Sequence, residues 1–438
     1  DKIIITMYRE IEMNIYKKII TVFLAVFIIL SLSSAVFAEG NKTDAYRDYT
    51  EKTLIVAHKG SCENAPENSI RSINAAVSNG ADIIEIDVRV TADGVLVLME
   101  DETVERTCYG YGENIVVSEM TYDELSSLKL LDGHGGYGAK QTEEKIPTLE
   151  EVFKDRDFRY AASSVYLDGQ KPLLLIDADW NLRDRIYNLA KEYNKLDEII
   201  LYTDASADEI TAFKSDILTE PMIMTYFKGN VIFAATSNVK KDSIIADGIH
   251  LATANPYGVV FGATVQNKAG ESGIRTMASP CIPAICGKVM QDTEEWWDYL
   301  IGKGFSMIMT DHVAELKAYL DDCDEAKAEL EKIYKTTVTQ WTLPPFNSDN
   351  FHDYKLAYTN AVSAAEKIFA DKSYARSDIQ QTAYELQKAY DEINAHYDEF
   401  EAGTAGLTIT LPRILLCIVT VAVVVCAEIY VYKKKKKA

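Results

Sequence analysis

Two pairs of acidic residues have the spacing that places side chains on one face of a β-strand. Glu85 and Asp87 alternate within an apolar run, and Asp177 and Asp179 alternate at the end of another. Residues i and i+2 of a strand point to the same side, so each pair presents two carboxylates to one space. Converging carboxylate oxygens suit a hard divalent cation. The sequence therefore predicts a Ca²⁺ or Mg²⁺ site at these strands.

Short apolar runs alternate with amphipathic helices over residues 54–320. The runs that we interpret as strands cover residues 54–57, 83–88, 95–98, 173–176, 199–202, 222–224, 244–246, 281–285 and 307–309. Near-continuous apolar strands separated by helices, such as 69–78 and 182–193, indicate a parallel sheet covered by helices. The length of this region favours an α/β fold of the (β/α)₈ TIM barrel type over a doubly wound sheet. One or two of the runs then belong to hairpins or loops.

Functional side chains of a (β/α)₈ barrel lie at the carboxyl ends of its strands. His58 and Lys59 end the first run, Glu100 follows the third, and Asp311 ends the last. We therefore expect these side chains at the same mouth of the barrel as the paired carboxylates.

An ordered set of motifs lies in the same region. It consists of His58-Lys59-Gly60, Pro66-Glu67-Asn68-Ser69, GADIIEIDV at residues 80–88, Thr91-x-Asp93-Gly94, Asp101 followed by Arg106-Thr107, and IPTLEE at residues 146–151. In order and spacing these motifs resemble the glycerophosphodiester phosphodiesterase family, and residues 304–311 resemble its last strand. The resemblance covers residues 54–320, and a chance match to the whole ordered set is improbable.

The resemblance implies a barrel that hydrolyses glycerophosphodiesters to glycerol 3-phosphate and an alcohol with a divalent cation. Position by position, it makes Glu85, Asp87 and Asp177 the metal ligands and His58 the first catalytic histidine. Glu67 is expected to orient its neighbours or the substrate. A cation would neutralise the phosphoryl oxygens while an imidazole transfers a proton at the reacting oxygens.

Three positions depart from the family pattern. Lys59 stands where members usually have Arg, Glu100 where they have a second His, and Asp179 where they have Lys. We interpret Glu100 as a replacement acid or base, and Lys59 and Asp179 as substrate-binding residues, although a structural ion pair stays open for Asp179. Lost positive groups weaken the stabilisation of a dianionic transition state. A second hypothesis therefore stays open, in which an impaired barrel acts as a cell-surface binding or scaffold protein.

Several other side chains leave alternatives open. His134, His250 and His312 could each supply a second imidazole or serve only packing or the surface. Cys62 and Cys108 follow the first and third strands, and they either form a disulfide or stay free thiols.

Both ends of the sequence carry membrane signals. Lysines, an apolar stretch and a small-x-small finish at residues 35–38 predict a signal peptide over residues 1–38, with an uncleaved anchor as the alternative. Residues 414–432 are apolar enough to span a bilayer and precede a lysine-rich tail, 433–438, that can contact anionic lipid inside the cell. With a linker at 39–53, these segments predict a single-pass protein of the cell membrane whose barrel is extracytoplasmic.

A helical region separates the barrel from the predicted membrane segment. We expect a helix and linker over 321–344, with the helix at 322–336, and a small all-α module over 345–400 with helices at 351–369 and 377–397. A linker at 401–413 would follow. Tyr354, Ala357, Tyr358 and Ala361 have the spacing that resembles FIVAR modules of Gram-positive surface proteins, which implies contact with cell-wall glycan or a spacer role. An Ala-rich helical stalk is the alternative.

The charge balance limits the partners. The 438 residues include 67 acidic and 45 basic side chains, for a net charge of −22, in a composition ordinary for a globular protein. Nucleic acid binding needs clustered Lys and Arg on the bound face, so the balance argues against nucleic acid as the main partner. The expected substrate is a glycerophosphodiester, such as a deacylated phospholipid, or a glycerol-phosphate wall polymer.

Overall fold

The computed structural model describes residues 46–48, 52–110, 114–154, 172–286, 288–339, 349–370 and 374–403. The described residues fall into two compact units: those up to Trp296 together with Phe305–Lys317, and Trp297–Gly304 together with those from Ala318 onward. The predicted signal peptide, transmembrane helix and basic tail lie outside the described residues. Within the described ranges, no helix is long and apolar enough to cross a bilayer.

The first unit is a closed barrel of parallel strands. Its strands are β1 (Leu54–Ala57), β2 (Ile83–Val90), β4 (Leu173–Ala178), β5 (Ile199–Thr203), β6 (Met222–Lys228), β7 (Gly248–Ala252), β8 (Arg275–Ala278) and β9 (Met307–Thr310). Each strand pairs in parallel with the next, and β9 pairs with β1 to close the ring. Strand β3 (Leu96–Leu98) pairs antiparallel with β2, as expected for a hairpin strand. The predicted (β/α)₈ barrel is confirmed.

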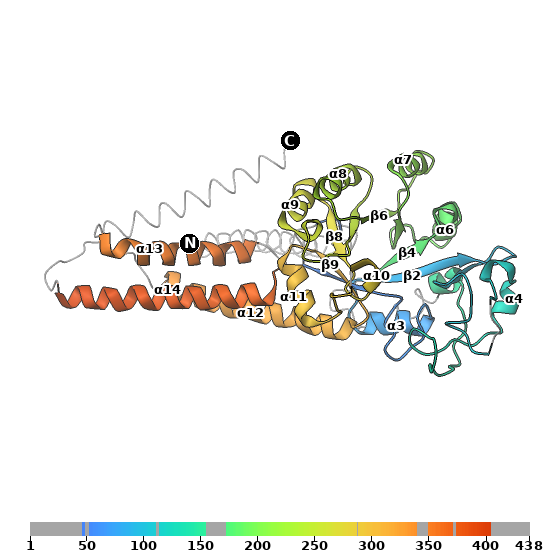
Figure 1. Ribbon diagram of the computed structural model, residues 1–438, viewed down its shortest axis with the longest axis horizontal. Coiled ribbons are helices and arrows are strands. Elements are labelled where there is room, and N and C mark those ends of the chain that lie inside the picture. The colour runs from blue at the N-terminus through green and yellow to red at the C-terminus, as the bar shows by residue number, and fades with distance from the viewer. Residues whose placement is uncertain are drawn as a thin grey trace, which may run out of the picture. The chain divides into compact units, whose positions relative to one another are not determined.

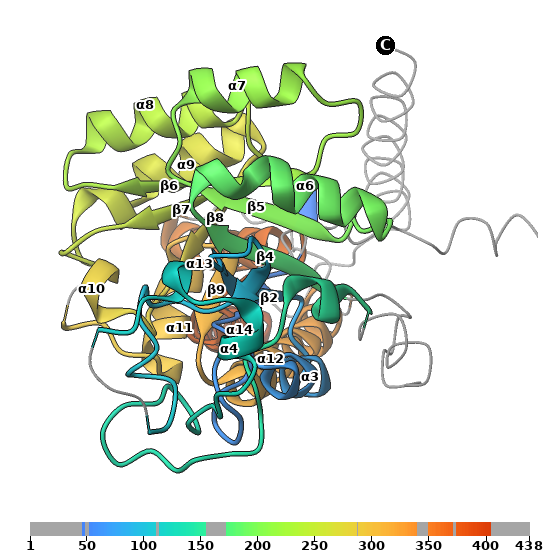
Figure 2. The same ribbon diagram turned by 90° about the vertical axis from the view of Figure 1, so that its right-hand side faces the viewer.

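Helices cover the outside of the barrel. They include α3 (Ile70–Ser78), α6 (Arg183–Glu192), α7 (Ala207–Ser215), α8 (Ile232–Asp242) and α9 (Ala263–Ser272). The connections also contain the short helices α4 (Tyr122–Leu125) and α10 (Pro283–Cys286) and the 3₁₀ turns η1 (Val117–Glu119), η2 (Trp180–Leu182) and η3 (Val259–Phe261). Helix α11 (Glu294–Gly302) belongs mostly to the second unit. Figure 1 shows the succession of elements, and Figure 2 shows α6 to α9 outside strands β5 to β7. The barrel interior is a methionine-rich core that includes Met222, Met224, Met277, Met307 and Met309.

Two predicted strands were wrong. Residues 244–246 belong to the connection after α8, and the strand begins only at Gly248. Residues 281–285 were misread because they are apolar, whereas Pro283 begins the short helix α10. The strand there is β8, which carries the charged residue Arg275. Its guanidinium is fully buried and donates to the backbone carbonyls of Tyr46, Asp48 and Ser306.

A left-handed turn after β1 positions His58 and Lys59. Lys59 has φ 55° and Gly60 has φ 83°, a region that only Gly enters without steric cost. The turn packs on α3, where the Ser72 hydroxyl donates to the Lys59 carbonyl at 3.1 Å. Helix α3 begins at a capping box in which the side chains of Ser69 and Ser72 each accept from the other's backbone N–H. The start of this helix therefore holds the first part of the site.

The second unit is helical. It contains most of α12 (Val313–Thr339), together with α13 (Asp349–Ala370) and α14 (Arg376–Gly403), each longer than the sequence predicts. Buried apolar residues recur at helical spacing in α14, at Ile379, Leu386 and Ile393. The Tyr358 hydroxyl of α13 donates to the Thr337 carbonyl of α12 at 3.1 Å. The FIVAR resemblance and the glycan contact stay predictions.

We expect Gly60→Ala to destabilise the barrel more than Gly136→Ala. Both glycines have φ near 82°, so each alanine costs about 1 kcal/mol of backbone strain. At position 60 the new Cβ would also lie 2.6 Å from the backbone carbon of Ser72, whereas nothing lies within 4 Å at position 136. Urea unfolding should show an extra loss of about 1–3 kcal/mol for Gly60→Ala. Equal losses would show that the turn does not depend on this close approach.

Candidate active site

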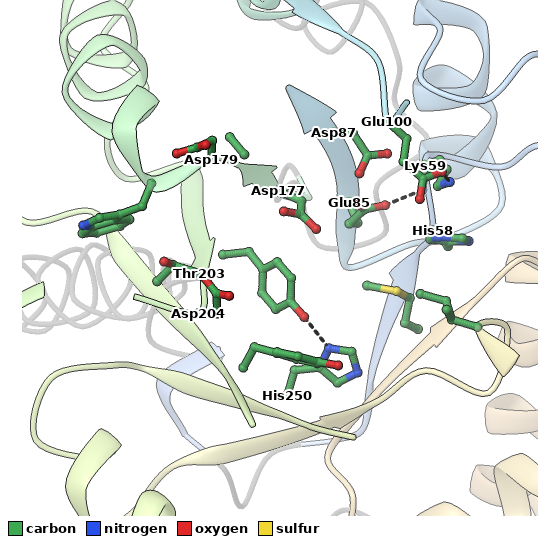
Figure 3. Close-up of a pocket in the computed structure, with 16 residues that line it drawn as sticks. His58, Lys59, Glu85, Asp87, Glu100, Asp177, Asp179, Thr203, Asp204 and His250 are labelled. Atoms are coloured by element: carbon green, nitrogen blue, oxygen red, sulfur yellow. Dashed lines mark hydrogen bonds and ion pairs between the residues drawn. The ribbon is translucent and has the colours of Figure 1, made fainter. Parts of the chain in front are cut away.

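Three carboxylates meet at the carboxyl ends of β2 and β4. Asp87 and Asp177 are directly paired across these strands. Glu85 lies two residues before Asp87, on the same face of β2. One carboxylate oxygen from each of the three lies within 4.8 Å of the other two. Figure 3 shows the three side chains pointing into one pocket. The predicted metal ligands therefore converge.

Burial makes this cluster electrostatically unfavourable without a cation. The pKa of Glu85 is raised well above its usual value by burial and by its neighbours Asp87 and Asp177. Burial and the charges of Asp87 and Glu100 raise the pKa of Asp177 to about 7. Burial also raises the pKa of Asp87, against the opposing effects of Lys59 and of the Asn68 amide, which donates to it at 2.7 Å. Oxygen donors with uncompensated negative charge fit a hard divalent cation.

His58 stands beside the cluster, at the end of β1. Its Nδ1 lies 2.9 Å from Oδ1 of Asp311, which follows β9. A carboxylate on Nδ1 fixes the ring and directs Nε2 to the pocket that His58 lines. This is the arrangement of an imidazole held for proton transfer.

Lys59 and Glu100 form an ion pair at the edge of the same pocket. The backbone N–H of Lys59 also donates to Oε2 of Glu85 at 2.8 Å. Burial opposes the charge of Lys59, but Asp87, Glu67 and Glu100 raise its pKa above the usual value. Arg106 donates to Oε2 of Glu100 at 3.1 Å as well. The Glu that replaces the family histidine thus shares one oxygen between two cations.

Glu67 lies behind the pocket and does not line it. Arg106 binds both of its oxygens, at 2.6 and 2.9 Å, and Nδ1 of His134 lies 2.9 Å from Oε2. Burial opposes ionisation, yet these hydrogen bonds lower the pKa of Glu67 to about 2. Its geometry is that of a residue that orients neighbours, and direct substrate contact stays a prediction.

The three other histidines that the sequence proposes for a second imidazole lie in different environments. His134 lies with its ring centre 5.9 Å from that of His58, and its Nε2 lies 3.4 Å from the same Asp311 oxygen. His250 is buried in the pocket wall between the hydroxyls of Tyr202 and Ser279, and burial lowers its pKa to about 3. His312 is on the surface, 3.1 Å from Glu63. Of the three, only His134 reaches the Asp311 carboxylate that holds His58.

Sequence reasoning missed one wall of the pocket. The cavity has a volume of about 540 Å³, and its lining includes the side chains of Trp180, Tyr202, Asp204 and Tyr226. Asp204 directly follows β5, as Asp179 follows β4. The rule that strand ends carry function could have found Asp204, whereas nothing in the sequence distinguishes these aromatic residues from core residues.

Cys62 and Cys108 are free thiols. Cys62 Sγ donates to the Lys59 carbonyl at 3.4 Å, and Cys108 Sγ lies 3.9 Å from the Thr107 hydroxyl. Burial raises the pKa of both thiols. Of the two alternatives, the free thiols are the ones observed.

Comparison with known proteins identifies the barrel. Residues 58–254 match the model of the glycerophosphoryl diester phosphodiesterase family. The barrel region of this chain is therefore similar to this family. A glycerophosphodiester phosphodiesterase of Caldanaerobacter subterraneus subsp. tengcongensis is 38% identical over 153 residues, which are 34% of this chain and 57% of the relative. One of Bacillus subtilis is 35% identical over 130 residues, 28% of this chain and 41% of the relative.

The matched part thus spans about half the length of these two relatives. Among solved structures, a glycerophosphoryl diester phosphodiesterase from Parabacteroides distasonis is 24% identical, with a TM-score of 0.49 over 64% of this chain and 91% of that one. The family model and the two bacterial relatives confirm the resemblance drawn from the motifs. The roles of individual site residues stay predictions that rest on the geometry above.

Removing one charge from the cluster should stabilise the metal-free barrel. In Asp177→Asn the repulsion from Asp87 disappears, so we expect a melting temperature higher by roughly 2–4 °C in EDTA. Added Ca²⁺ or Mg²⁺ should raise the melting temperature of the wild type but not that of the variant. Asp197→Asn is the matched control, because Asp197 is exposed and precedes β5 at the opposite end of the barrel. A wild-type metal response in Asp177→Asn would contradict the ligand assignment.

His134 should make stability depend on pH. Hydrogen bonds to Asp311 and Glu67 raise its pKa to about 9 from a value near 6.5 in the unfolded chain. Its protonated form therefore stabilises the fold fully below pH 6.5, and this stabilisation is lost as the pH rises to 9. The titratable and charged groups facing it are Glu67, Asp311, His58 and Arg106.

We expect His134→Asn to be less stable than the wild type at pH 6, with the difference shrinking toward pH 9. Urea unfolding at a series of pH values measures this difference. A difference that stays constant from pH 6 to pH 9.5 would show that His134 is not protonated in the fold.

Proposed function

We propose that the barrel is a metal-dependent glycerophosphodiester phosphodiesterase that releases glycerol 3-phosphate and an alcohol. The observation that carries this proposal is the convergence of Glu85, Asp87 and Asp177 beside His58 within the region that matches the family. The names of the two bacterial relatives point to the same reaction. Ca²⁺ and Mg²⁺ both suit an all-oxygen site.

The residues present fit a divalent cation, because three carboxylates, two buried and one half-buried, share one small space. Glu85, Asp87 and Asp177 would hold it, and when bound it supplies positive charge against the phosphoryl oxygens. His58 moves a proton at Nε2 while Asp311 holds Nδ1 and stabilises the protonated ring. Lys59 adds a buried positive charge at the edge of the pocket.

Glu100 takes the second acid–base role in this proposal. Lys59 and Arg106 both bind its Oε2, so proton transfer falls to Oε1. Asp179 lines the pocket as a substrate-binding residue, and its Oδ1 accepts from the Asn181 N–H at 2.8 Å. These positions replace the family's histidine and lysine with carboxylates.

We further propose a location at the cell membrane. The signal at 1–38 and the apolar segment at 414–432 support a single-pass protein with its barrel outside the cytoplasm. The helical module would act as a spacer or bind cell-wall glycan. Substrates in that place are deacylated phospholipids or glycerol-phosphate wall polymers.

One observation favours the second candidate, a binding or scaffold protein. Lys59 is paired with Glu100, so its charge is partly neutralised before any phosphate arrives. Each lost element of transition-state stabilisation can cost about 2.7–4 kcal/mol. A barrel of this kind would still bind metal and ligand but would not turn over.

An assay of the full chain in detergent distinguishes the enzyme from the binding protein. It measures the release of glycerol 3-phosphate from glycerophosphocholine. We expect release with Ca²⁺ or Mg²⁺, none in EDTA, and a loss of about 10²–10⁴-fold in kcat for His58→Ala. His312→Ala is the control, because His312 lies on the surface outside the pocket. No release with either cation, combined with a metal-dependent rise in melting temperature, would support the binding protein.

A further inference from the structure

Two carboxylates stand apart from the metal cluster. Asp179 and Asp204 lie on the side of the pocket away from His58 and Lys59 (Figure 3). Both are exposed, and neither forms an ion pair with a cation of the described residues. Lys59, the one Lys or Arg among the described lining residues, is already bound to Glu100. This side of the pocket therefore carries negative charge that no cationic side chain of the lining neutralises.

Aromatic side chains complete the same wall. The Tyr202 and Tyr226 rings lie 6.1 Å apart in an edge-to-face arrangement, and the Tyr202 hydroxyl and Nδ1 of His250 are 2.7 Å apart. His250 is neutral because its pKa is lowered to about 3 by burial, so it adds no positive charge. Trp180 is held by the Arg183 guanidinium, 5.2 Å from its ring, and by an edge-to-face contact with Phe213. The wall thus combines fixed aromatic rings with two carboxylates that form no ion pair with a lining cation, one of which, Asp179, accepts a hydrogen bond from the Asn181 N–H.

Aromatic faces with nearby carboxylates attract ammonium groups. Proteins commonly recognise quaternary ammonium ligands in this way. The substrate of the proposed reaction has three parts: an anionic phosphate, a neutral glycerol and a second alcohol. The phosphate belongs at the metal cluster and Lys59. A positive charge that matches Asp179 and Asp204 can come only from the second alcohol.

We propose that this wall, formed by Asp179, Trp180, Tyr202, Asp204 and Tyr226, selects glycerophosphodiesters whose leaving alcohol carries an ammonium group. The inference rests on the proposed function and names the class of substrate within it. Of the two substrate classes considered above, it favours deacylated phospholipids with a cationic head group. A glycerol-phosphate polymer would bring further phosphates against the two carboxylates, and like charges repel.

A matched pair of substrates tests the proposal on the full chain. Glycerophosphocholine and its 3,3-dimethylbutyl analogue have the same shape, but only the first carries the positive charge. We expect kcat/KM to favour the choline ester by roughly tenfold or more. Asp204→Asn should reduce this ratio several-fold, whereas the control Asp197→Asn, with the same change of charge at the other end of β5, should keep it. A ratio near one in the wild type would overturn the proposal.

Binding measured without turnover distinguishes this proposal from the proposed reaction. Calorimetry with choline and with neutral 3,3-dimethylbutanol needs no hydrolysis. If the protein hydrolyses no diester but binds choline, and this binding weakens in Asp204→Asn, the ammonium site is supported and the proposed reaction is overturned. Turnover of both esters at equal kcat/KM, without preferential choline binding, would keep the reaction and overturn the ammonium site. Neither turnover nor choline binding would overturn both.

Discussion

The burial of three like charges at one end of the barrel is the constraint on which the rest of the site depends. Glu85, Asp87 and Asp177 come within 4.8 Å of one another because the parallel pairing of β2 with β4 sets Asp87 opposite Asp177. In the unfolded chain, where β2 and β4 are not paired, the three carboxylates would stay apart and hydrated. Their repulsion is opposed by donors aimed at them: the Lys59 N–H at Glu85 and the Asn68 amide at Asp87. The strained left-handed turn at Lys59 is what aims the first of these donors.

A second layer of alternating charge holds the proton-transfer group. Asp311 contacts both His58 and His134, and Glu67 contacts both His134 and Arg106. Hydrogen bonds from the two histidines keep the pKa of Asp311 well below its usual value although burial opposes its charge. Because Asp311 and Glu67 each contact two partners, removal of either carboxylate would take an ion-pair partner from two side chains. His58 is therefore positioned by residues that do not line the pocket.

The sequence was most informative where apolar strands end in polar residues. His58, the carboxylates of β2 and β4, and Asp311 could be placed at one mouth, because strand ends of a barrel meet there. Strands β7 and β8 could not be found in this way, since they carry buried His250 and Arg275, whose partners come from distant parts of the chain. The aromatic wall could not be predicted from the sequence either. Its members sit on η2, β5 and β6 and become one surface only after the barrel closes.

The departures from the family pattern make physical sense as a set when the substrate brings its own cation. A diester with an ammonium alcohol has no net charge, so its binding requires less positive charge from the protein than a plain phosphodiester does. Asp179, where the family has lysine, then faces the ammonium group instead of the phosphate. Glu100, where the family has histidine, is balanced internally by Lys59 and Arg106. Positive charge at the phosphate would then come from a cation held by Glu85, Asp87 and Asp177, from Lys59 and from the imidazole of His58.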